Sequence, residues 1–156
     1  MYLTIAILTI TLSAFFSGVE IAFISSNKLQ LELDKGSEKI SSKVISFFSR
    51  NESNFITTML IGNNVSLVIY GIIMAKLLTP YLQYFAFNAF YLLFVQTIIS
   101  TSIILVTAEF LPKSIFKIYP NKTLRIFAFP IFVFFILFKP FVWFFMHASN
   151  LIIKLF

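Results

Sequence analysis

Residues 85–108, FAFNAFYLLFVQTIISTSIILVTA, contain no charged side chain and are followed directly by Glu109. A run of about 20 apolar residues is long enough to cross the hydrocarbon core of a bilayer as a helix. An ionisable group inside such a helix costs about 2.5–3.5 kcal/mol on insertion scales, and it usually faces a bundle interior and serves a pathway. The stretch therefore predicts a transmembrane helix that carries a functional carboxylate near its end.

The composition of the whole chain indicates an integral membrane protein. The chain has 156 residues, of which 59% are hydrophobic and 12% charged, and 22 are Phe. Its mean hydropathy of +0.94 is too high for a soluble domain. The lack of cysteine excludes disulfides and thiolate metal sites. Although the net charge is +6, Lys and Arg flank the apolar runs, so we expect a lipid bilayer and no nucleic acid as partner.

The apolar runs predict an all-α integral membrane fold that forms one domain over residues 1–156. We expect three transmembrane helices, one cytoplasmic amphipathic helix and a pair of short re-entrant helices. The transmembrane helices are predicted at about 2–25, 54–79 and 85–112, the amphipathic helix within the juxtamembrane segment 27–52, and the short helices at about 121–139 and 141–155.

The distribution of basic residues predicts the topology. Lys and Arg are concentrated in segments 27–52 and 113–125, whereas the loop 79–84 has no charge. The positive-inside rule then puts the N-terminus outside and the C-terminus in the cytoplasm of a multi-pass protein of the plasma (inner) membrane. The first apolar stretch has no basic leading region and no small-residue cleavage site, so we expect a retained helix.

Two segments allow alternative interpretations. In the last apolar run, Pro130, Lys139 and Pro140 favour two short helices that enter the membrane and return, with a break at Lys139-Pro140. A kinked fourth span is the alternative, and it would put the C-terminus outside. In segment 27–52, an apolar stripe fits a helix on the membrane surface or a simple cap on the bundle. The stripe consists of Ile40, Val44, Phe47 and Phe48.

Polar residues interrupt each of the three predicted spans. A helix rises about 1.5 Å per residue, so the interruptions all fall in the inner half of the bilayer. They are Ser13, Ser17, Gly18 and Glu20 in the first span, Gly62, Asn63 and Asn64 in the second, and Glu109 in the third. Three helices with polar residues at a similar depth predict a buried cation site.

The residue types at these positions favour a hard cation. Hydroxyl, amide and carboxylate oxygens are the ligands that Mg²⁺ and Ca²⁺ prefer. Gly18 and Pro112 can each loosen a helix and release backbone carbonyls toward a cavity. A single carboxylate suits a transport site, which must release its ion.

A role in helix packing is the alternative to a cation site. The serines and asparagines could simply fasten neighbouring helices together, and Glu109 could pair with Lys113. No second carboxylate, His pair or nucleophile–base pair lies near Glu109 in the sequence, so we predict no catalytic residue and no enzyme.

Three motifs resemble those of the CNNM/CorC family of magnesium transporters. Residues 16–22, FSGVEIA, resemble the FSGSETA signature of that family. Residues 60–64, LIGNN, and residues 108–113, AEFLPK, resemble its LIGNN and GEILPK segments. The motifs occur in the family's order and spacing, and the resemblance covers essentially the whole chain.

The resemblance implies three transmembrane helices, a pair of short helices and a homodimer. It implies a Mg²⁺ site with Ser17, Asn63 and Glu109 as ligands and with Ser13, Gly18 and Asn64 nearby. Export of Mg²⁺ by alternating access, coupled to Na⁺ influx, is the implied activity. Family members usually continue into cytoplasmic CBS domains that bind ATP, so the chain looks like the membrane portion of a longer protein.

The chain departs from the family pattern at four positions, Val19, Ile21, Leu67 and Ala108, each of which removes a polar group or backbone freedom near the predicted site. The ion affinity or ion preference can therefore differ from that of the family. Some relatives are membrane factors of gliding motility or hemolysin-like proteins. The alternative function is therefore a membrane-anchoring or interaction domain of a larger complex that does not transport ions.

Overall fold

The computed structural model describes residues 1–27, 40–85 and 88–155, and these residues form helices and no strand. Four helical runs are long and apolar enough to cross a membrane, namely Tyr2–Ser25, Glu52–Leu82, Ala89–Ile118 and Pro120–Ser149. The chain is therefore an all-helical, multi-pass membrane domain. Its elements are α1 (Tyr2–Ser25), α3 (Ile40–Arg50), α4 (Glu52–Leu82), α5 (Ala89–Ile104), the π-helix η2 (Leu105–Phe110), α6 (Leu111–Ile118) and α7 (Pro120–Leu155).

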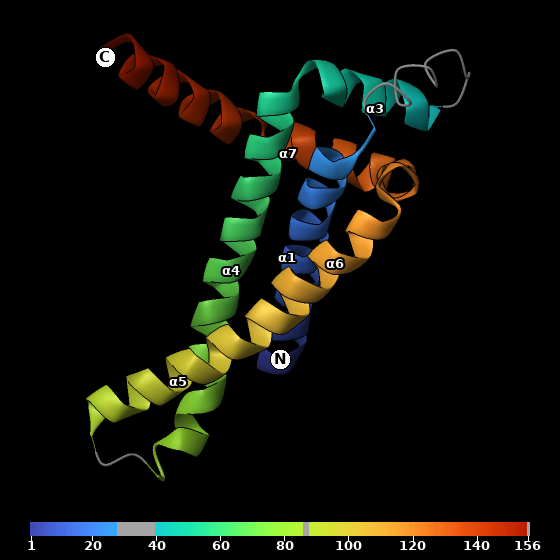
Figure 1. Cartoon of the computed structure of the whole chain (residues 1–156). Coiled ribbons are helices and arrows are strands. Elements are labelled where there is room, and N and C mark those ends of the chain that lie inside the picture. The colour runs from blue at the N-terminus through green and yellow to red at the C-terminus, as the bar shows by residue number, and fades with distance from the viewer. Residues whose placement is uncertain (28–39, 86–87, 156) are drawn as a thin grey trace.

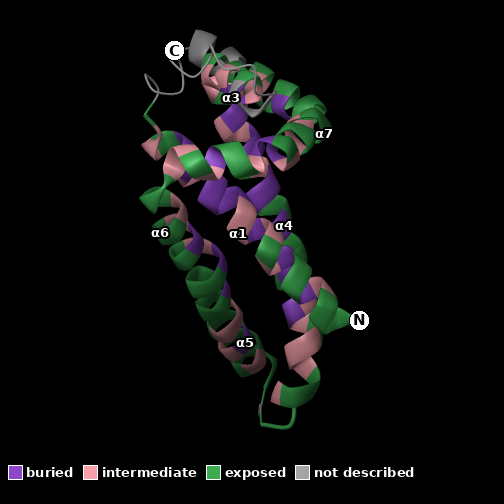
Figure 2. Ribbon diagram, turned by 90° about the vertical axis from the view of Figure 1, so that its right-hand side faces the viewer, coloured by how far each residue is buried: buried purple, intermediate pink, exposed green. Residues whose placement is uncertain are grey.

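Helix α1 forms the centre of the domain. It packs against α4, η2, α6 and α7 (Figure 1). A helix with neighbours on several sides has no need of a polar face, and α1 is apolar apart from a few small polar side chains and Glu20. The buried residues are concentrated where α1, α4 and α7 meet, whereas α5 is largely exposed (Figure 2). Helix α1 therefore supplies the common wall of any site between the helices.

Aromatic side chains join α1 to α4 and α7. Phe23 stacks on Phe55 of α4 with ring centroids 4.2 Å apart. Phe16 packs edge-on against Phe134 and Phe138 of α7, at centroid distances of 4.8 and 6.1 Å. Without a hydrophobic driving force inside a bilayer, van der Waals packing of this kind is a main source of helix association.

Helix α7 corrects the prediction of two short helices with a break at Lys139-Pro140. The structure has a single helix that contains both Pro130 and Pro140. A proline removes only its own backbone donor, and neighbouring helices let a membrane helix continue through it. Helix α7 contacts α1, α3, α4 and α6. Figure 1 shows α7 crossing the end of the bundle beside α3.

Other helix boundaries also differ from the predictions. Helix α4 continues through Pro80 to Leu82, and the third helical run continues past Pro112 to Ile118. The π-helix inside that run was not predicted. In α3, Ile45 and Phe48 are the buried residues, whereas Phe47 of the predicted stripe is exposed. Residues 28–39 of the predicted juxtamembrane segment lie outside the described part of the chain.

Candidate metal centre

The third helical run switches from α-helix to π-helix at η2, where it packs against α1. In η2, the N–H of Leu111 bonds to the carbonyl of Val106, five residues back instead of four. Such single π turns inside α-helices are often found at functional sites. Pro112 has no N–H, so it cannot bond to the Ala108 carbonyl four residues earlier. The hydroxyl of Ser17 donates to this carbonyl instead, and α1 is thereby joined to η2.

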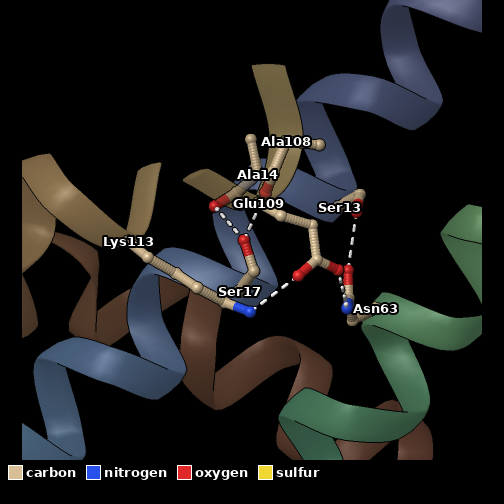
Figure 3. A network of polar contacts seen from close by, with 7 residues as sticks. All are labelled: Ser13, Ala14, Ser17, Asn63, Ala108, Glu109 and Lys113. Atoms are coloured by element: carbon tan, nitrogen blue, oxygen red, sulfur yellow. Dashed lines mark hydrogen bonds and ion pairs between the residues drawn. The ribbon is translucent and has the colours of Figure 1, made fainter. Parts of the chain in front are cut away.

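A second set of hydrogen bonds joins α1 to α4 and α4 to η2. The Ser13 hydroxyl donates to Oδ1 of Asn63 at 2.6 Å. The Asn63 amide donates to Oε1 of Glu109 at 3.4 Å, and Nζ of Lys113 lies 2.7 Å from Oε2 of the same carboxylate. Figure 3 shows these side chains pointing toward one another from three separate helical runs. We call Ser13, Ser17, Asn63, Glu109 and the Ala108 carbonyl the oxygen cluster.

The oxygen cluster is closed on one side and accessible on the other. Ser13 and Ser17 are fully buried and Asn63 is 8% exposed. The side chain of Glu109 is 32% exposed. It lines a surface pocket of about 370 Å³ together with Lys113, Ser114 and Lys117. The pocket beside Glu109 is therefore one route by which an ion could approach the cluster.

Two glycines allow the helices to approach closely at the cluster. A Cβ on Gly62 would lie 2.5 Å from ring atoms of Phe16, and a Cβ on Gly18 would lie 2.5 Å from the ring of Phe116. Small residues at helix interfaces permit this kind of close backbone contact in membranes. Gly62 therefore sets the separation of α1 and α4, and Gly18 that of α1 and α6.

The structure brings four of the six predicted site residues together. Ser13, Ser17, Asn63 and Glu109 all belong to the oxygen cluster, in agreement with their predicted proximity. Gly18 is buried but packs toward Phe116, and Asn64 is exposed on the surface of α4. Neither of these two belongs to the oxygen cluster.

Two groups that take part in this hydrogen-bond network were not predicted as site residues from the sequence. Pro112 was the available signal for the Ala108 carbonyl, because in a regular α-helix a proline leaves the carbonyl four residues earlier without its helical donor. Lys113 appeared only as an alternative partner of Glu109, and it does form this ion pair. Glu20 of α1 is half-buried and interacts electrostatically with both Lys113 and Glu109.

The donor set of the cluster fits a hard cation better than a soft one. Its atoms are hydroxyl, amide, carbonyl and carboxylate oxygens, which Mg²⁺ and Ca²⁺ prefer. Among the residues that the structure describes, no three His, Cys, Asp or Glu side chains come together as a metal-binding group. Glu109 is therefore the one formally charged donor of the oxygen cluster.

Comparison with known proteins places this arrangement in a family. The sequence profile described as "Cyclin M transmembrane N-terminal domain", CNNM, matches residues 4–156. The chain belongs to the CNNM family. A curated relative, the UPF0053 protein MG146 of Mycoplasma genitalium, is 28% identical over 146 residues, which are 88% of this chain and 34% of that protein. The CNNM domain thus spans about a third of this relative.

The family assignment agrees with the three motifs found in the sequence. Each motif of the CNNM domain contributes to the oxygen cluster, through Ser17 in the first, Asn63 in the second and Glu109 in the third. The family profile runs across all helices of the domain, including α7. The resemblance to the CNNM/CorC family is therefore confirmed.

Proposed function

We propose that the domain binds Mg²⁺ at the oxygen cluster and moves it across the membrane by alternating access. The direction proposed is export, coupled to Na⁺ influx, as the family resemblance suggests. One observation carries this proposal: hydrogen bonds join oxygen-bearing groups from three separate helical runs beside a single carboxylate. In this role Glu109 supplies charge, while Ser17 and Asn63 replace oxygens of the hydration shell.

The shape of the site supports a transport role. The pocket beside Glu109 offers an approach from one side, and the fully buried serines close the other side. The π turn and Pro112 interrupt regular helix at the same place, so the third helical run has a natural point at which to bend. Bending there would open the cluster to alternate sides around a fixed ion site.

The assembly and setting of the domain are part of the same proposal. We propose a homodimer in the plasma membrane, with the N-terminus outside, the C-terminus in the cytoplasm, and CBS domains as cytoplasmic partners in the full-length chain. Helices α3 and α7 lie at the same end of the bundle, opposite the N-terminus (Figure 1), as this orientation requires. The match covers only 34% of the Mycoplasma genitalium relative, so the CBS partners are proposed from the family resemblance alone.

A helix-fastening role is the competing function, and one observation favours it. No buried side-chain nitrogen or oxygen in the described part of the chain lacks a hydrogen-bond partner. Polar side chains that satisfy one another can hold membrane helices together without binding an ion. In that case the domain would anchor a larger complex, and divalent cations would not affect it.

Ion flux separates the two functions. We expect wild-type protein in liposomes to carry Mg²⁺, measured with an internal fluorescent indicator, and Ser17→Ala to reduce the rate by about tenfold or more because a ligand oxygen is lost. Thr9→Ala is the matched control, since Thr9 is also buried in α1 but its hydroxyl bonds only to carbonyls of its own helix. Wild-type protein that is folded and carries no Mg²⁺ under any Na⁺ gradient would exclude the proposal.

Pro112→Ala tests whether the Ala108 carbonyl, which accepts a hydrogen bond from Ser17, belongs to the site. Alanine supplies the backbone N–H that proline lacks and is a much better helix former, so we expect equal or higher thermal stability without Mg²⁺. We also expect weaker Mg²⁺ binding, because a backbone donor would then compete for this carbonyl. Thermal unfolding across a Mg²⁺ titration measures both effects, with Pro80→Ala in α4 as the control. An unchanged response to Mg²⁺ would remove Ala108 from the site.

A further inference from the structure

Lys113 already forms an ion pair with Glu109. Its Nζ lies 2.7 Å from Oε2, while Oε1 faces Asn63. An ammonium at this distance takes one of the two carboxylate oxygens that a divalent cation would need. The Lys113 side chain is 41% exposed and lines the pocket beside Glu109, so it has room to move away.

Glu20 offers Lys113 a second partner. It lies on α1, within the same motif as Ser17, and is half-buried. It attracts Lys113 and repels Glu109. A lysine carries its point charge on a flexible stem, and Ile21, the neighbour of Glu20, lines the same pocket as Lys113, so we expect the transfer to occur by a movement of this side chain.

The charges show why such a transfer matters. With both carboxylates ionised, Glu20, Glu109 and Lys113 carry a net charge of −1, and a bound Mg²⁺ changes this to +1. Without Lys113 the same group would carry −2 and be neutralised by the ion. Lys113 therefore weakens the binding of a divalent ion, which suits a site that must release it.

We infer that Lys113 is a tethered counter-ion that holds Glu109 while the site is empty and moves to Glu20 when Mg²⁺ binds. This inference rests on the proposed function, because it needs a divalent ion at Glu109. It assigns to Lys113 the control of affinity and to Glu20 the role of receiving the displaced ammonium. A competitor that leaves the site free in only about a tenth of molecules lowers the apparent affinity about tenfold.

The test measures the Kd for Mg²⁺ of the detergent-purified chain by thermal unfolding across a Mg²⁺ titration. We expect Lys113→Met to lower the Kd by about tenfold. We expect Glu20→Gln to raise the Kd more in the wild-type background than in Lys113→Met, because in Lys113→Met only the loss of one nearby negative charge remains and no ammonium needs a second partner. Lys122→Met removes one positive charge from the start of α7 and should leave the Kd unchanged.

A charge-retaining variant keeps the test valid if Lys113→Met does not fold. Arginine holds a carboxylate through two parallel hydrogen bonds, so Lys113→Arg should raise the Kd for Mg²⁺. Equal or tighter Mg²⁺ binding by Lys113→Arg would overturn the inference, as would an equal or higher Kd in folded Lys113→Met.

The outcomes distinguish this inference from the proposed function. A Mg²⁺ response that depends on Glu109 but ignores every change at Lys113 overturns the counter-ion role alone. Equal effects of Glu20→Gln in both backgrounds overturn the transfer to Glu20. No Mg²⁺ response in wild type, Lys113→Met or Lys113→Arg overturns both proposals together.

Discussion

Glu109→Gln is expected to remove most of the stabilisation of the domain by Mg²⁺. A ligand that binds only the folded state stabilises it by RT ln(1 + [L]/Kd), about 2.7 kcal/mol at a concentration of 100 Kd. Glutamine keeps the size of the side chain but removes the one formal charge of the oxygen cluster. We expect the Kd to rise by roughly 100-fold, about 2.8 kcal/mol, since loss of one partner of a buried charge pair costs about 2–5 kcal/mol.

Controls separate this effect from a general loss of charge. Glu52→Gln removes an acidic side chain from the first turn of α4, well away from the cluster, and should leave the response to Mg²⁺ unchanged. Thermal unfolding across titrations of Mg²⁺, Ca²⁺ and Na⁺ gives the comparison. A Mg²⁺-induced shift of the same size in Glu109→Gln would exclude Glu109 as a ligand.

Gly62→Ala is expected to destabilise the domain and weaken Mg²⁺ binding at the same time. The new Cβ would lie 2.5 Å from the Phe16 ring, which is itself buried against α7 and has little room to move. Overpacking of a core typically costs about 1–3 kcal/mol. The separation of α1 and α4 would increase, and with it the distance between Ser13 and Asn63.

Two further variants identify the cause of this effect. Gly71 lies on the same helix, and a Cβ added there would meet no atom within 4 Å, so Gly71→Ala should be tolerated. In Gly62→Ala, the additional change Phe16→Leu makes room for the new methyl group and should restore part of the lost Mg²⁺ affinity. If Gly62→Ala binds Mg²⁺ as tightly as wild type, close packing at this position does not set the geometry of the site.

The sequence was sufficient to predict which helices meet at the site. Ser17, Asn63 and Glu109 could be placed at one depth because helix rise is regular and each interrupts an otherwise apolar run. Polar side chains inside apolar helices have few possible partners other than one another, so we expected these residues to lie close together. The hydrogen bonds from Ser13 to Asn63 and from Asn63 to Glu109 confirm this prediction.

The winding of the helices could not be predicted in the same way. The π turn at residues 105–110 leaves the apolar pattern intact, because the whole run is apolar. Pro130 and Pro140 predicted a break, but α7 packs against four other helices and stays continuous. The π turn and the continuity of α7 both depend on tertiary packing, and the hydrophobic pattern of the sequence carries no information about that packing.

One polar group away from the cluster was also missed. The Tyr70 hydroxyl of α4 donates to the Ser100 carbonyl of α5 at 3.0 Å, and Gln96 is buried beside them in a pocket of about 350 Å³. Gln96 and Ser100 are four residues apart in a stretch without charge, which puts them on one face of the helix. That spacing was the available signal for a contact between α4 and α5.

The most direct test of a cation site at the oxygen cluster is an anomalous-scattering map from crystals grown with Mn²⁺ in place of Mg²⁺. Both ions favour octahedral oxygen coordination, so Mn²⁺ reports the position of Mg²⁺. We predict one peak in each domain, at coordination distance from the Glu109 carboxylate and from the Ser17 and Asn63 side-chain oxygens, which disappears in Glu109→Gln. A peak bound elsewhere, or an empty cluster at saturating Mn²⁺, would contradict this account.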